Sequence, residues 1–125
     1  MDDRTMKRLV ERADILKAIA SPVRLFILER LEDEDLPVSL LAEGAGVSMP
    51  TLSRHLFRMK KAGILESRRR DNFVFYGLRN KGIMTVRANI EGVLVRETGR
   101  LKTLSRNENR KVGRDRRSGG TQGGR

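Results

Sequence analysis

A tight turn in the middle of the chain limits the possible folds more than any other feature of the sequence. Residues 44–47 carry glycines at positions 44 and 46, and glycine supplies backbone angles that other residues resist. The apolar segment before the turn, residues 38–43, predicts a short helix. Ser48 can cap a further helix over residues 49–61, and Pro50 fits its first turn. Helix, tight turn and capped helix together predict a helix-turn-helix.

Patterned segments flank this unit on both sides. Apolar residues at helical spacing predict a helix over residues 3–18 with Asp3 as its cap, and Ser21-Pro22 starts a second helix reaching about residue 32. Residues 64–70 and 73–78 predict two strands joined by a tip at residues 71–72. Asn80 can cap a last helix to about residue 104. The expected fold is therefore mainly α-helical with a small β-hairpin, a winged helix-turn-helix.

Basic charge is concentrated in one middle segment and in the C-terminal segment. The formal net charge is +11, yet residues 1–47 carry 7 basic and 10 acidic side chains. Residues 48–81 carry 9 basic and 2 acidic side chains, and residues 106–125 carry 7 and 2. A basic patch beside an acidic region indicates a polyanionic partner that meets one face. The alternative interpretation is an ordinary solvated surface.

The helix over residues 49–61 is the candidate recognition helix. Leu52, Leu56 and Met59 share one stripe and are expected to be buried, which leaves the polar residues for the major groove. Thr51 and Arg54 are best placed to reach base edges, and an arginine that binds guanine discriminates by about 1–3 kcal/mol. The remaining candidates for bases or phosphates are Ser53, Arg58 and Lys61 on the helix, and the N–H groups near Ser48, Met49 and Thr51.

The hairpin adds a second group of candidate DNA-binding residues. Arg68, Arg69 and Arg70 alternate between the two faces of a strand, so they cannot all touch one surface. Arg70 and Asn72 at the tip are expected to reach DNA in preference to Arg69, and Arg68 is kept as a candidate. Such contacts give mainly salt-sensitive affinity. An exposed charged hairpin without a partner is the alternative.

Several other classes of site are not expected. The chain has no cysteine, which excludes disulfides and thiolate metal sites. His55 is its one histidine, and we expect it to be a structural hydrogen-bonding residue or a phosphate contact, not a metal ligand. No catalytic motif or phosphate-binding glycine loop is present, so neither an enzyme nor a cofactor is expected. The sequence also lacks a long apolar run or a signal peptide, which predicts a cytoplasmic protein.

The C-terminal segment differs in composition from the rest of the chain. Residues 107–125 contain Val112 as their one apolar residue, too little to offset the entropy of ordering, so we expect disorder. The expected organisation is a DNA-binding and dimerisation domain over residues 1–105 and a basic tail over residues 106–125. The tail could lie along DNA phosphates through five basic residues: Arg110, Lys111, Arg114, Arg116 and Arg117.

Four segments resemble the ArsR-type transcriptional regulators: residues 16–28 (LKAIASPVRLFIL), 47–56 (VSMPTLSRHL), 61–65 (KAGIL) and 75–78 (FYGL). The resemblance implies a homodimeric winged helix-turn-helix that binds imperfect palindromes in double-stranded DNA and usually represses transcription. It also implies dimerisation through the first and last helices. Two apolar stripes agree with that implication: Met6, Leu9, Val10, Ala13 and Leu16 in the first helix, and Ile83, Val86, Ile90, Val93, Leu94, Leu101 and Leu104 in the last.

The chain departs from the metal-sensing members of that family. Residues 36–41 hold no thiol where many members carry a cysteine motif, and the last helix offers Glu91 and Glu97 but no histidine. An effector would therefore be an organic molecule or a protein, if one exists. Two alternatives to a specific repressor stay open: a weakly specific, nucleoid-associated protein, and a winged-helix module for protein–protein contact.

Overall fold

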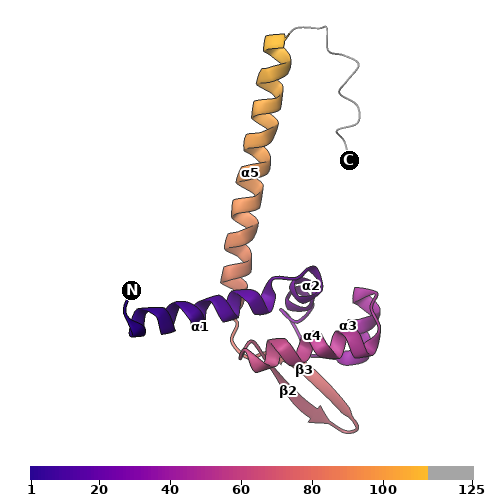
Figure 1. The fold of residues 1–125 in the computed structure, drawn as a ribbon. Coiled ribbons are helices and arrows are strands. Elements are labelled where there is room, and N and C mark those ends of the chain that lie inside the picture. Colours follow the sequence, from indigo (N-terminus) through magenta and orange to yellow (C-terminus); the bar gives the residue numbers. More distant parts are fainter. Residues whose placement is uncertain (113–125) are drawn as a thin grey trace. The chain divides into compact units, whose positions relative to one another are not determined.

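The computed structural model describes residues 1–112, with side chains to residue 103 (Figure 1). The described chain comprises two units, one from Met1 to Arg87 and one from Ala88 onward. The first unit holds a helix-turn-helix with a β-hairpin, so the expected fold class is confirmed. The elements in chain order are α1 (Asp3–Ile19), α2 (Pro22–Arg30), β1 (Leu36–Pro37), α3 (Val38–Ala45), α4 (Met49–Lys61), β2 (Leu65–Arg70), β3 (Phe73–Leu78) and α5 (Ile83–Val112).

Side-chain caps set the beginnings of the first helices. Asp2, not Asp3, caps α1, because its carboxylate accepts the N–H of Thr5 at 2.8 Å. Two adjacent aspartates compete for this position, and the one three residues before Thr5 has the required reach. Ser21 caps α2 as expected, accepting the N–H of Arg24 at 3.3 Å.

The turn between α3 and α4 has the expected left-handed glycine. Gly46 has a φ of 70° and ends α3, which extends two residues beyond its expected end. Gly44 has another role, because a Cβ there would lie 3.0 Å from the ring of Phe26. The missing side chain therefore lets α3 pack closely against α2.

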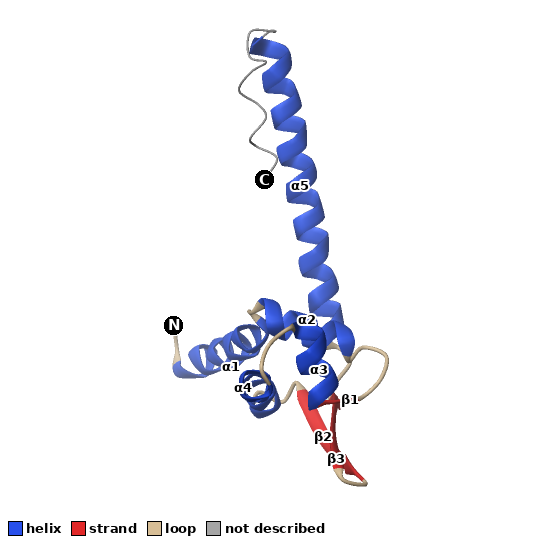
Figure 2. Cartoon of the chain, turned by 90° about the vertical axis from the view of Figure 1, so that its right-hand side faces the viewer, coloured by secondary structure: helices blue, strands red, loops and turns tan. Residues whose placement is uncertain are grey.

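The hairpin is part of a three-stranded sheet whose order is β1-β3-β2. Figure 2 shows it projecting from the helices of the first unit. The expected tip is confirmed: Arg70 pairs with Phe73, and Asp71 has a φ of 54°, which aspartate tolerates better than most residues. Sequence patterning missed β1, a two-residue strand that pairs Leu36 with Tyr76.

One hydrophobic core fixes α4 against the rest of the first unit. It joins residues from all five helices, with Ile83 at the beginning of α5, and from the strands β1 and β2. No polar or charged residue is buried among the residues whose burial the structure describes. The largest fully buried side chains are Ile27, Leu28, Leu41, Leu52, Leu56, Met59 and Leu65.

The last helix differs from its expected bounds at both ends. Asn80 accepts the N–H of Gly82 at 2.7 Å in the preceding turn, and α5 begins at Ile83. The helix then continues to Val112, through residues assigned to a disordered tail. Residues 106–111 include arginine, glutamate and lysine, which extend an existing helix readily. The rest of the expected tail, residues 113–125, lies outside the described residues. None of the helices within residues 1–112 has the length and apolar character needed to cross a membrane.

Candidate nucleic-acid interface

Helix α4 divides into a buried stripe and an exposed polar face. Leu52, Leu56 and Met59 are all 0% exposed, as the helical spacing predicted. Ser53, Arg54, Arg58 and Lys61 are exposed, while Thr51 and His55 are partly exposed at the edge of that face. The apolar stripe therefore anchors α4 in the core and directs its polar side chains outward.

A hydrogen-bonded network orders the beginning of α4. The Ser48 hydroxyl accepts the N–H of Thr51 at 3.3 Å and lies 3.0 Å from the Thr51 hydroxyl. Arg54 also donates to that hydroxyl, at 3.4 Å. The Thr51 N–H is thus taken by the cap and is not a free phosphate donor, contrary to expectation. The network holds Thr51 and Arg54 together on the exposed surface.

His55 is hydrogen-bonded to α2. Arg24 donates to its Nδ1 at 3.0 Å, and also to the carbonyl of Lys17 at 3.3 Å. The pKa of His55 is lowered by partial burial and by the positive charges of Arg24 and Arg54. A neutral imidazole that accepts at Nδ1 carries its proton on Nε2, so His55 offers one N–H donor at the edge of α4.

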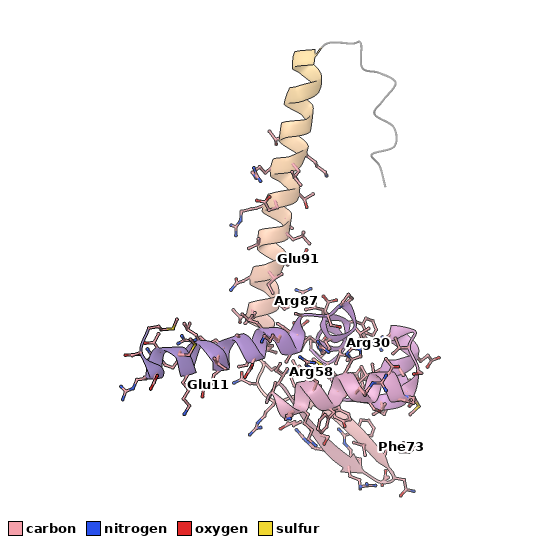
Figure 3. The ribbon with its side chains drawn as sticks, viewed as in Figure 1. Glu11, Arg30, Arg58, Phe73, Arg87 and Glu91 are labelled. Carbon is pink, nitrogen blue, oxygen red and sulfur yellow. The ribbon has the colours of Figure 1, made fainter. Side chains whose placement is uncertain are left out.

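Positive charges crowd the exposed face of α4 (Figure 3, where Arg58 is labelled). Burial and the nearby Arg58 lower the pKa of Arg24, and the helix itself contains no acidic residue. A groove of about 780 Å³ runs between this face and α1. Positive charges this close repel one another, so a bound anion would be stabilised. The residues lining the groove are Asp14, Lys17, Ala18, Ser53, Arg54, Phe57, Arg58, Lys61 and Ala62.

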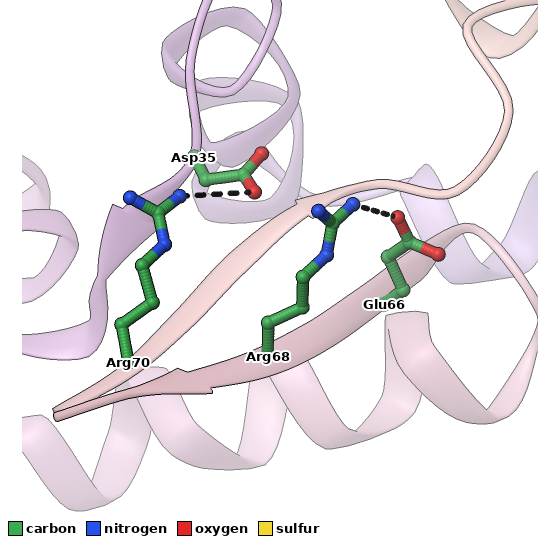
Figure 4. Close-up of polar contacts among 4 residues, drawn as sticks. All are labelled: Asp35, Glu66, Arg68 and Arg70. Atoms are coloured by element: carbon green, nitrogen blue, oxygen red, sulfur yellow. Dashed lines mark hydrogen bonds and ion pairs between the residues drawn. The ribbon is translucent and has the colours of Figure 1, made fainter. Parts of the chain in front are cut away.

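The hairpin arginines differ from the basic residues of α4 because two of them have acidic partners (Figure 4). Arg68 pairs with Glu66 at 2.7 Å, and Arg70 lies 3.9 Å from Asp35. The Arg70 guanidinium also stacks on Phe75, 4.6 Å from the ring centroid. Gly77 makes room for Asp35, since a Cβ there would overlap its carboxylate.

The opposite face of β2 meets α4. Lys60 donates to the Ser67 hydroxyl at 2.7 Å, and Leu65 on the same face is buried. Because side chains alternate along a strand, Arg69 shares this face with Ser67. The structure therefore puts Arg69 on the α4 side of the hairpin, whereas sequence analysis favoured Arg70. Asn72 is exposed at the tip.

Four residues that shape this surface were not predicted from the sequence. Arg24, Lys60 and Asp35 act through partners far away in sequence, so no local pattern could have revealed them. Phe57 carried a usable signal, because it lies one helical turn after Ser53 and Arg54 and off the buried stripe. Among the residues described, no cluster of three or more His, Asp or Glu side chains could hold a metal ion.

Comparison with known proteins agrees with this geometry. A helix-turn-helix domain model matches residues 19–68. The biofilm growth-associated repressor of Xylella fastidiosa is 38% identical over 72 residues, which cover 58% of this chain and 63% of that relative. The transcriptional repressor SdpR of Bacillus subtilis is 34% identical over 65 residues, covering 52% of this chain and 72% of that relative. The chain thus spans less than two thirds of the Xylella repressor.

A solved structure extends the similarity to the fold. It is a homodimeric winged helix-turn-helix DNA-binding domain from Mycobacterium bovis, a possible ArsR-family transcriptional regulator. The two chains are 26% identical with a TM-score of 0.70, and the match covers 78% of this chain and 91% of that one.

Proposed function

This chain belongs to the ArsR-type family of winged helix-turn-helix transcriptional regulators, and we propose that it is a dimeric repressor that binds a palindromic operator. The observation that carries the proposal is the exposed face of α4. The network of Ser48, Thr51 and Arg54 orders donors at the beginning of the helix, where a recognition helix meets base edges. Arg58 and Lys61 add positive charge on that face for the phosphates.

Exposed apolar residues on two helices support a homodimer. On α1, Met6, Leu9 and Leu16 are 48%, 44% and 52% exposed, and on α5, Val93 and Leu94 are 56% and 57% exposed. Apolar side chains in rows of this kind mark an interface. A twofold dimer would present two recognition helices to two half-sites about one helical turn apart.

The absence of cysteine makes a thiolate metal switch impossible in this chain. We propose that regulation, where it occurs, uses an organic molecule or a protein and not a metal bound by thiolates. A DNA-binding regulator is supported by the basic face of α4, the groove beside it and the exposed apolar residues of α1 and α5.

Selection of bound duplexes from a random pool tests the function directly. We expect an enriched palindromic half-site repeated at one helical turn. Affinity for that duplex and for a shuffled duplex of equal composition should then be titrated against salt. A ratio of about a thousandfold or more at physiological salt supports specific regulation. A ratio near one would instead identify a weakly specific, nucleoid-associated protein.

The division into a domain over residues 1–105 and a basic tail over residues 106–125 is a separate proposal. Its support is the charge of the last twenty residues. Deleting residues 107–125 should lower affinity for selected and shuffled duplexes alike and flatten the salt dependence. Unchanged affinity and slope would remove the tail from the interface.

A further inference from the structure

An exposed aromatic ring stands on the outer face of the recognition helix. Phe57 is 66% exposed, although it lies on a helix whose other large apolar residues past the first turn are fully buried. It follows Ser53 and Arg54 by one helical turn, so its ring shares their face of α4. The ring lines the groove between α4 and α1, but it stays largely exposed and is not part of the core, which leaves it available for contact with a partner.

Basic side chains outnumber acidic ones around Phe57, because Asp14 is the one acidic residue that lines the same groove, and this charge restricts what can cover the aromatic ring. Arg54, Arg58 and Lys61 lie three residues before, one after and four after Phe57, and all three are exposed. A second copy of the same face would bring like charges together and be repelled. A polyanion is complementary to these positive charges, which favours DNA over another copy of the chain.

The major groove offers one apolar group of matching chemistry, the C5-methyl group of thymine. We infer that Phe57 packs against a thymine methyl in the operator and so helps to determine its sequence. This inference rests on the proposed DNA-binding function. Arg54, one turn earlier on the same face, would contact a neighbouring base, so Phe57 extends base reading along α4 by one turn.

Replacing thymine by uracil tests the contact, because the replacement removes only the methyl group. Each thymine of the selected operator is changed to deoxyuridine at symmetric positions, and the affinities of wild-type protein and Phe57→Ala are compared. At one thymine the wild-type protein should lose about fourfold per half-site, the effect of one buried methyl group, or about fifteenfold for both. Phe57→Ala should bind the thymine and uracil duplexes equally.

Two matched variants separate this contact from a general effect on binding. Phe57→Leu keeps an apolar side chain and should retain part of the preference for thymine. Lys61→Ala removes a charge on the same face and should weaken both duplexes by the same factor. The Phe57 side chain is exposed, so circular dichroism should show unchanged folding in its variants.

Three results would overturn the inference. If Phe57→Ala keeps the wild-type preference for thymine at every position, Phe57 reads no methyl group, although the proposed function stands. If Phe57→Ala changes the oligomeric state of the protein in solution, the aromatic ring belongs to a protein–protein interface. If no duplex is enriched from the random pool, the proposed function fails, and the inference fails with it.

Discussion

Helix α4 and the β2–β3 hairpin both carry clusters of basic residues, but the two clusters differ in their neighbours. On the hairpin, Arg68 and Arg70 lie beside Glu66 and Asp35. On α4, Arg54 and Arg58 have no salt bridge within residues 1–103, and their nearby charges include Arg24. The comparison shows that the number of basic residues does not measure what an element can offer to DNA. Charges without acidic partners are available at once, whereas paired ones must first be released.

The largest expected effect comes from removing the unopposed charges of α4. The double variant Arg54→Ala/Arg58→Ala should lose at least about a hundredfold in affinity for the selected operator, because each arginine acts once per half-site and a base contact is worth about 1–3 kcal/mol. Fluorescence anisotropy with labelled duplexes measures the loss. Arg96→Ala/Lys102→Ala on α5 removes the same charge and serves as the control. Unchanged binding by the folded double variant would contradict the assignment of the recognition helix.

Disrupting the proposed dimer should have the next largest effect, because it would remove one of the two recognition helices. Leu9→Asp/Leu16→Asp places charges on the exposed stripe of α1, outside the core of the protomer. We expect light scattering to show a monomer with normal helix content. Its affinity for a palindromic duplex should fall to the affinity for a duplex that carries a single half-site. A variant that stays dimeric would exclude the α1 stripe as an interface.

Substitutions on the two faces of the hairpin should have smaller effects on DNA affinity, and the effects should differ between the faces. Arg69→Ala, on the face shared with Ser67, should lower affinity several-fold and reduce the salt slope by about one per protomer. Arg70→Ala should cost less, because Arg70 must leave Asp35 and the ring of Phe75 to reach DNA. Affinities measured over a range of salt concentrations distinguish the two.

Asp35→Asn is the matched variant for this comparison, since it removes the acidic partner of Arg70 and leaves the hairpin unchanged. It should raise affinity slightly, because an exposed ion pair is worth about 0–1 kcal/mol. A larger loss from Arg70→Ala than from Arg69→Ala would reverse the assignment of the two faces.

The smallest expected effect concerns His55 and pH. Its folded-state pKa lies below the usual 6.5, so the unfolded chain takes up the proton first as the pH falls. The free energy of unfolding should therefore decline as the pH falls below about 6.5 and level off beneath the folded-state pKa. Urea unfolding of wild-type protein and His55→Asn at neutral and acidic pH measures this contribution. Equal declines in both proteins would show that His55 contributes nothing to the pH dependence of the free energy of unfolding.

Local sequence signals determined most of the helix-turn-helix. Ser21 and Ser48 cap their helices, Gly46 takes the left-handed turn, and the stripe containing Leu56 is buried. Each of these depends on neighbours within a few residues, which is why spacing alone predicted them. Local residue types likewise predicted both strands of the hairpin and its tip.

The tertiary structure alone decided how the basic residues are used. Asp35 meets Arg70, and Arg24 meets His55, across 35 and 31 positions of sequence. Such pairs form because packing brings distant elements together, and no pattern within one element encodes them. Strand alternation told us that Arg69 and Arg70 face opposite ways, but only the packing of β2 against α4 showed which of them lies beside the recognition helix.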